Sequence, residues 1–240
     1  MSTTTDRSLS ERFETAFNRI HKALKENVTN AKSDKFTDLV RQGKKHGVIR
    51  YYEADLCQFA KLRNAIVHEK IDDGYYIAEP HEDIVKKIEK IADAFEKPSS
   101  ALSISTKKVY SFRETDPLSE VLKVINKYGY SEFPIYDEKG QYRWLLTSAE
   151  IVKYLSAYFN EDNINLKRVK LLDLYDEKKD YHVRFVDQNA TVFETEDLFE
   201  EFHKNNKKLE CIIITAKGTT VEEPNGIITS SDLLIEQITE

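Results

Sequence analysis

The second half of the chain contains two copies of one pattern, and this duplication limits the available folds more than any other feature. In the first copy, short apolar runs at 130–137 and 143–150 flank a glycine turn. The second copy repeats this order at 208–215 and 225–232. In each copy an amphipathic helix precedes the runs, and a Thr-Ser-x-acid step opens another helix. Two helix–strand–turn–strand–helix units predict an α/β module.

The first half of the chain instead repeats apolar side chains at helical spacing. A capping box at Ser8 and Glu11 predicts the start of its first helix. A later helix is predicted over 51–70, a turn at 72–74, and another helix after Pro80. Helices joined by short loops predict a small bundle.

The expected fold class is therefore α+β, with an all-α helical bundle followed by an α/β module. The segment Lys-Pro-Ser-Ser that begins at Lys97 interrupts the helical period and predicts the boundary. The bundle is then expected to cover residues 1–97 and the module 98–240. Within the module, the two copies are expected to span about 101–165 and 166–240.

Charge and cysteine content narrow the classes of function. Residues 1–100 hold 18 basic and 17 acidic side chains, whereas residues 101–240 hold 18 and 25, so a nonspecific nucleic-acid binder is not expected. Two cysteines are too few for a disulfide framework or a zinc cluster. The polar N-terminus and the strand-length apolar runs predict no secretion signal and no membrane partner, and a reducing cytoplasm is the expected compartment.

The strand-to-helix step that ends the second copy carries residues suited to a sugar phosphate. Thr229 and Ser230 stand at the expected helix start, where free backbone N–H groups attract phosphate and the hydroxyls add donors. Asp232 follows and can accept both hydroxyls of a ribose, and Gly226 permits close approach of ligand or backbone. The alternative is that Thr229 or Ser230 caps a helix, with Asp232 favourably placed in its first turn.

The order of the two copies resembles the tandem CBS domain pair, also called the Bateman module, over roughly residues 101–240. The strand with Phe133 and Pro134 looks like the family's first inner strand, whose backbone reads the adenine edge. The resemblance implies that an adenosine-type ligand binds in clefts between the copies, such as AMP, ADP, ATP, S-adenosylmethionine or cyclic di-AMP. It also implies that Thr229 contacts phosphate and Asp232 contacts the ribose.

The first copy departs from this pattern. Trp144 replaces the glycine and Glu150 replaces the aspartate, although Thr147 is kept. The longer carboxylate still reaches a ribose, and Trp144 either blocks the cleft or supplies a stacking wall. We therefore expect the Asp232 site to be the stronger one and the Glu150 site to be weaker or empty. Four cations are candidate partners of the ligand's phosphates, with solvated surface charge as the alternative: Lys107, Lys108, Arg113 and Arg184.

One polar set stands out near the end of the predicted helix over 51–70. Asn64 and His68 are four residues apart and share a helix face, with Arg63 at its edge. An imidazole moves protons near neutral pH, and a guanidinium stabilises charge that grows on a phosphate. RNA brings its own 2′-hydroxyl nucleophile, so no metal is required. The alternative is structural, because Arg63 and His68 can also cap helix carbonyls or pair with nearby acids.

This set resembles the motif of the HEPN family, over about residues 8–97. Many members of that family are metal-independent ribonucleases that act as dimers, while others only bind nucleotides or partners. The resemblance implies that Arg63 and His68 form the active pair and that Asn64 orients them. Both resemblances imply a homodimer.

The favoured function is that of an adenine-nucleotide sensor whose ligand state regulates the helical domain. In its stronger form, the output is RNA cleavage at Arg63 and His68, with RNA as a second partner. The rival is a non-catalytic sensor or scaffold whose helical half dimerises or recruits a partner. The sequence leaves open whether the chain is an enzyme, which adenine ligand binds and which RNA is cut.

Overall fold

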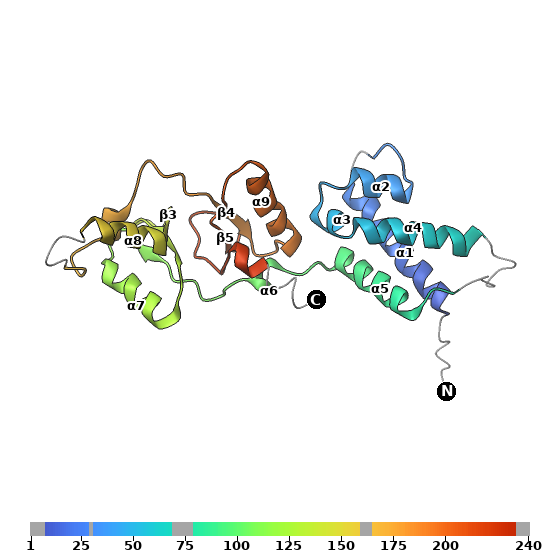
Figure 1. The fold of residues 1–240 in the computed structure, drawn as a ribbon, viewed down its shortest axis with the longest axis horizontal. Helices are drawn as coiled ribbons and strands as arrows, with labels where there is room; N and C mark the ends of the chain where they lie inside the picture. The colour runs from blue at the N-terminus through green and yellow to red at the C-terminus, as the bar shows by residue number, and fades with distance from the viewer. Residues whose placement is uncertain (1–7, 29–30, 69–78, 159–164, 234–240) are drawn as a thin grey trace, which may run out of the picture. The chain divides into compact units, whose positions relative to one another are not determined.

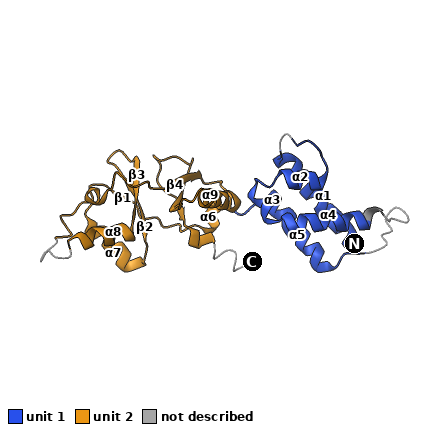
Figure 2. Ribbon diagram, turned by 45° about the horizontal axis from the view of Figure 1, so that its top comes forward, with its two compact units in different colours: residues 1–99 blue, residues 100–240 orange. Residues whose placement is uncertain are grey.

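The computed structural model describes residues 8–28, 31–68, 79–158 and 165–233 (Figure 1). The chain divides into two units, residues 1–99 and residues 100–240 (Figure 2). Unit 1 is helical, and unit 2 combines helices with two small sheets. This arrangement confirms the predicted α+β class.

The described part of unit 1 contains α1 (Leu9–Asn27), α2 (Phe36–Gln42), α3 (Gly47–Tyr51), α4 (Glu53–His68) and α5 (Glu82–Glu96). Their apolar stripes meet in one core, in which Phe13, Leu56 and Ile88 are fully buried. Helices α1 and α5 pack together, and the Arg12 guanidinium donates to the Glu89 carboxylate at 2.9 and 2.7 Å. Burial of the stripes and this bidentate pair fix α1 against α5.

The capping box predicted for the first helix is present. The Glu11 N–H donates to the Ser8 hydroxyl at 3.2 Å, and the Ser8 N–H donates to the Glu11 carboxylate at 3.1 Å. The helix predicted over 51–70 corresponds to α4, which a short break separates from α3. The turn predicted at 72–74 lies outside the described residues.

Unit 2 contains two three-stranded sheets of the same topology (Figure 2). The first consists of β1 (Phe112–Arg113), β2 (Glu132–Tyr136) and β3 (Tyr142–Thr147), and the second of β4 (Val183–Asp187), β5 (Cys211–Thr215) and β6 (Gly226–Ile228). In each sheet the first two strands pair in parallel and the last two pair antiparallel. The helical elements are α6 (Ala101–Ile104), α7 (Leu118–Tyr128), α8 (Ser148–Ala157), α9 (Val192–Lys204) and the 3₁₀ turn η1 (Leu171–Leu174).

Sequence patterns indicated the antiparallel hairpins β2–β3 and β5–β6, but not the first strands, β1 and β4. Strand β1 is only two residues long, too short for any periodicity. Strands β4 and β5 pair with each other although α9 lies between them in the sequence, and Val183 lies opposite Cys211. A parallel partner this distant in the sequence leaves no turn signal beside it, and only the apolar alternation of Val183 and Phe185 marked the strand.

The two sheets share an apolar cluster formed by Leu145, Cys211, Ile213 and Ile227. Cys211 is completely buried, and burial raises the pKa of its thiol. Beside the cluster, the Tyr142 N–H donates to a backbone carbonyl of the second copy at 2.9 Å. The sheets of the two copies are therefore held together by a shared core and by a direct backbone bond.

Each copy also packs a segment that precedes the other copy in the chain. Helix α6 precedes the first sheet, yet Ala101 packs in the core of the second copy. Thr106 and Ile227 exchange backbone hydrogen bonds of 3.0 and 3.2 Å. In turn, η1 precedes the second sheet, but Leu171 packs in the core of the first copy and its N–H donates to the Asp116 carbonyl at 3.0 Å.

The exchange of segments requires a glycine at the start of β6. A Cβ atom on Gly226 would meet the Ser105 hydroxyl at less than van der Waals distance and would lie 3.2 Å from the Leu102 side chain. The sequence left open whether ligand or backbone approaches Gly226. In the structure, the neighbour at this position is the segment that follows α6.

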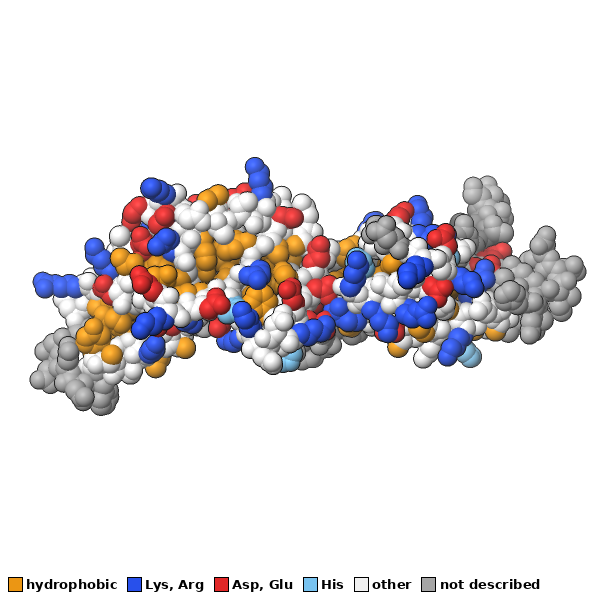
Figure 3. Space-filling model, turned by 90° about the horizontal axis from the view of Figure 1, so that it is seen from above, with side chains coloured by type: hydrophobic (Ala, Val, Ile, Leu, Met, Phe, Trp, Pro, Cys, Tyr) orange, Lys and Arg blue, Asp and Glu red, His pale blue; other side chains and the backbone are white. Residues whose placement is uncertain are grey.

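The surfaces of the two units differ in character. On the face shown in Figure 3, hydrophobic side chains gather in a band over unit 2, whereas charged side chains cover most of the visible part of unit 1. None of the helices in the described residues has the length and hydropathy that a membrane span needs.

The close approach at Gly226 yields a stability prediction. Gly226→Ala should destabilise unit 2 by about 1–3 kcal/mol, because Ser105 must move to admit the methyl group. Urea unfolding followed by fluorescence measures this directly, since the chain has one tryptophan and Trp144 is buried in unit 2. Adding Ser105→Gly should recover part of the loss. An unchanged unfolding midpoint in Gly226→Ala would contradict the packing at this position.

Candidate functional site

Asp232 lies in the first turn of the helix that follows β6, and its side chain folds back to Thr229. Residues 230–233 start this helix, and Thr229 is the residue before it. The Asp232 carboxylate accepts the Thr229 N–H at 2.7 Å and the Thr229 hydroxyl at 2.8 Å. The same hydroxyl lies 2.7 Å from the Ser231 hydroxyl, while Ser230 is exposed. In this structure, therefore, Asp232 serves as a helix cap.

The first copy has the same arrangement with a longer side chain. The Glu150 carboxylate accepts the Thr147 N–H at 2.8 Å and the Thr147 hydroxyl at 3.3 Å, at the start of α8. Each copy thus holds a threonine and an acid together at the end of its last strand. This geometry places a carboxylate beside the free N–H groups of a helix start.

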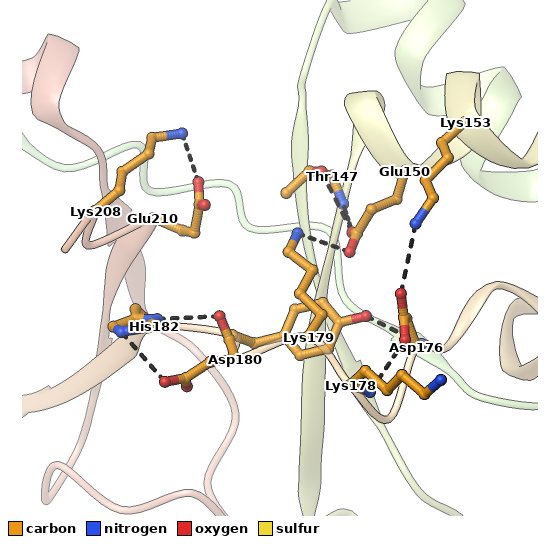
Figure 4. A network of polar contacts seen from close by, with 11 residues as sticks. Thr147, Glu150, Lys153, Asp176, Lys178, Lys179, Asp180, His182, Lys208 and Glu210 are labelled. Carbon is orange, nitrogen blue, oxygen red and sulfur yellow. Dashed lines mark hydrogen bonds and ion pairs between the residues drawn. The ribbon is translucent and has the colours of Figure 1, made fainter.

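In the first copy, Lys179 forms an ion pair with the Glu150 carboxylate. The described contacts of Asp232 in the second copy include no such lysine. The Lys179 ammonium donates to Glu150 at 2.8 Å and lies 4.8 Å from the centre of the Tyr181 ring (Figure 4). The Glu150 side chain is only 11% exposed. Burial raises the pKa of Tyr181 to about 12, and the charge of Glu150 adds to this effect. The segment that leads into β4 therefore covers the acid of the first copy.

The sequence did not indicate Lys179 as a residue near the acid of the first copy. It lies in a loop, 29 residues after its partner Glu150, and neither periodicity nor a motif marks it. The only signal was a second lysine beside it, Lys178, in a segment rich in charge. The structure alone reveals that one of these two lysines reaches back to the first copy.

Figure 4 also shows other polar contacts of unit 2. Lys153 approaches Asp176 at 3.5 Å, and the Lys178 N–H donates to the same carboxylate at 3.0 Å. The backbone bond from Lys178, followed by the Lys153 ammonium, lowers the pKa of Asp176. Just before β5, Lys208 pairs with Glu210 at 2.6 Å. Asp176 and Glu210 thus each have a lysine partner of their own.

Trp144 faces the core of the first copy. It is 1% exposed, and its ring centre lies 4.8 Å from that of Tyr175. On β3 it pairs with Ile135 of the neighbouring strand. Trp144 therefore fills the core between the sheet and the segment that follows η1.

The strand with Phe133 and Pro134 lies beside the acid of its own copy. Both residues are buried on β2, and Phe133 makes an edge contact with Phe112. The first residue of β2 pairs with Thr147, and the Ser131 carbonyl accepts the N–H of the first residue of α8 at 2.9 Å. The structure thus brings Phe133 and Pro134 close to Thr147 and its helix start.

Two of the four candidate phosphate partners are engaged elsewhere. Arg113 donates to the Asp137 carbonyl at 2.6 Å, and the Arg184 guanidinium stacks 4.5 Å from the centre of the Phe202 ring. Lys107 is exposed, and Lys108 lies over tyrosine rings. Among the described residues, no group of three His, Cys, Asp or Glu side chains is arranged to hold a metal ion.

The polar set of unit 1 lies near the end of α4. The Arg63 guanidinium lies 5.9 Å from the centre of the Phe17 ring on α1, and Asn64 is exposed. His68 is the last residue of α4, and its side chain lies outside the described part of the structure. The contact with Phe17 gives Arg63 a packing role between two helices.

Comparison with known proteins assigns the first copy. Residues 101–157 match the family model of the CBS domain. The match begins at α6 and ends with α8, so it includes Thr147 and Glu150. The first copy in unit 2 is accordingly similar to a CBS domain.

Individual relatives are distant. Over 158 residues, the chain is 28% identical to cystathionine beta-synthase of Saccharomyces cerevisiae; this covers 60% of the chain and 29% of that enzyme, so the chain spans less than a third of its length. A CBS domain-containing protein of Kribbella flavida is 14% identical, with a TM-score of 0.44 over 59% of this chain and 99% of that one. The CBS domain of a bacterial CNNM/CorC family Mg²⁺ transporter, solved with ATP, is 20% identical, with a TM-score of 0.43 over 67% of this chain and 99% of that one.

Proposed function

We propose that the CBS-like module binds an adenosine-type nucleotide at Thr229 and Asp232, and that its ligand state regulates the helical unit. The observation that carries the proposal is the cap after β6. There, a carboxylate, a threonine hydroxyl and the N–H groups of a helix start come together. They do so in the second copy of a repeat whose first copy matches the CBS domain.

The cap can be exchanged for a ligand without loss of hydrogen bonds. Asp232 now accepts the N–H and hydroxyl of Thr229. A ribose offers two hydroxyl donors to the same carboxylate, and a phosphate accepts from the N–H and hydroxyl that Thr229 releases. The Asp232 carboxylate therefore keeps two donors when the ligand replaces Thr229.

The two copies should differ in affinity. A ligand at Glu150 must first displace the Lys179 ammonium and open the segment that carries Tyr181. At Asp232, the described contacts come from the start of its own helix. We therefore assign the stronger site to Asp232 and the weaker one to Glu150.

The exchanged segment offers a route from the ligand to the helical unit. The chain leaves unit 1 at Ser99 and enters α6, which packs on the second copy. The following residues pair with β6 through Thr106 and Ile227, two residues before Thr229. A ligand that shifts the end of β6 thus acts on the segment that connects the units. Regulation requires that the ligand bind the two states with different affinity.

Titration calorimetry of the full chain with AMP, ADP, ATP, S-adenosylmethionine and cyclic di-AMP tests the site. At least one ligand should bind. Asp232→Asn should weaken it roughly 10- to 100-fold, because the ribose loses a charged acceptor. Glu150→Gln is the matched control, since it neutralises the equivalent acid and should leave the stronger site intact. Full-strength binding by Asp232→Asn, or no heat from any ligand, would overturn the assignment.

A more specific form of this proposal adds that unit 1 cleaves RNA and that the chain forms a homodimer. The contact of Arg63 with Phe17 agrees with a scaffold, whereas the exposed Asn64 on α4 leaves a polar face open to RNA. Incubating the chain with single-stranded RNA, with and without nucleotide, separates the two. Cleavage that disappears in His68→Ala but persists in His81→Ala supports a ribonuclease. No cleavage with any nucleotide leaves the scaffold.

A further inference from the structure

Three tyrosines gather at the C-terminal end of α7. The ring centres of Tyr110 and Tyr128 lie 5.2 Å apart at 27°, and those of Tyr128 and Tyr130 lie 5.9 Å apart at 19°. In the sequence, these tyrosines showed no pattern. The fold brings them together because the segment before β1, the last residue of α7 and the segment before β2 meet at one place.

Two lysines complete this cluster. The Lys108 ammonium lies 5.1 Å from the centre of the Tyr110 ring and 5.3 Å from that of Tyr128, and the Lys127 ammonium lies 5.0 Å from the Tyr128 ring. Both ammonium groups therefore lie close to the Tyr128 ring, and Lys108 also lies close to the Tyr110 ring. Within the described part of the chain, no carboxylate forms an ion pair with either lysine.

A structural role accounts for only part of this charge. Cations near a helix C-terminus offset the helix dipole, which amounts to about half a negative charge there. The last turn of α7 is already capped, because the Gly129 N–H donates to the Ile125 carbonyl at 2.8 Å. Lys108 lies outside the helix, in the segment before β1. Two full positive charges exceed what the helix end needs.

The cluster already favours a negative charge. The hydrogen bond with Tyr110, followed by that with Lys127, lowers the pKa of Tyr128 to about 8. The hydrogen bond with Tyr110 also raises the pKa of Lys108. In the absence of another anion, the groups thus stabilise the phenolate of Tyr128. An incoming anion would use the same ammonium groups.

We propose that Lys108, Lys127 and the hydroxyls of Tyr110 and Tyr128 form a binding site for a phosphate group. Two ammonium groups with adjacent hydroxyl donors are suited to a compact, multiply charged oxyanion. The phosphate comes either from a small inorganic phosphate or from a nucleotide held at Asp232. The second source rests on the proposed function. The nucleotide is the favoured source, because Lys108 follows Thr106 by two residues and Thr106 pairs with Ile227 of β6, near Thr229.

Calorimetry of the full chain with inorganic pyrophosphate and with ADP tests the site. Lys108→Gln/Lys127→Gln should weaken pyrophosphate binding at least 10-fold. The control Lys123→Gln/Lys139→Gln removes the same charge from other exposed positions of the first copy and should change binding less than 2-fold. Equal losses in both pairs, no loss in the first pair, or no pyrophosphate binding to the parent chain would overturn the proposal.

Asp232→Asn distinguishes the two sources. Pyrophosphate binding that persists in this variant assigns a separate phosphate site, even if no nucleotide binds to the chain. If ADP binding falls in both Asp232→Asn and the Lys108/Lys127 variant, the cluster holds the phosphates of the nucleotide. Either result supports the phosphate site, so its failure and that of the proposed function remain distinguishable.

Tyrosinate absorbance gives an independent readout. One tyrosine of the parent chain should ionise near pH 8 and should vanish from the titration in Tyr128→Phe. Pyrophosphate should raise this pKa, because it competes with the phenolate for Lys108 and Lys127. For the same reason, pyrophosphate affinity should fall as the pH rises through 8. A Tyr128 titration that saturating pyrophosphate leaves unchanged would contradict the site.

Discussion

The shared apolar cluster between the two sheets is the contact on which the rest of unit 2 depends. Leu145 of the first copy packs with Cys211, Ile213 and Ile227 of the second. Burial of each such side chain contributes about 1.5–3 kcal/mol, with cysteine at or below the low end. The cluster fixes the strands whose ends carry the threonine–acid pairs. The exchanged segments add backbone hydrogen bonds, between Thr106 and Ile227 and from Leu171 to Asp116.

The two threonine–acid pairs show how one local arrangement can serve two purposes. Each acid caps its helix in the structure described, which is the structural alternative that the sequence left open. In the proposed function, sugar recognition uses the same carboxylate oxygens as the cap, and the cap is the state that the ligand replaces. The copies then differ through their surroundings, because Lys179 already occupies Glu150. In the proposed function, the second copy thus keeps its site available, whereas Lys179 closes that of the first.

Local patterns predicted most of what the structure shows, and long-range contacts account for what they missed. The helices of unit 1 and the hairpins of unit 2 follow from apolar periodicity and turn residues. The step at Thr229 and Asp232 was recognisable because all its residues lie within one short segment. Lys179 reaches Glu150 from a distant loop, and the tyrosine cluster joins three separate segments. Trp144 faces the core together with Ile135, its partner on β2. The replacement of the family's glycine by Trp144 did not reveal this.

The most direct test follows the Thr229 backbone amide by NMR during a nucleotide titration. The account predicts that this amide loses its bond to Asp232 and shifts with the same dissociation constant that calorimetry gives for the ligand. Asp232→Asn should abolish the coupled shift. Saturation by nucleotide that leaves both the Thr229 amide and the Asp232 carboxylate resonances unchanged would contradict the account.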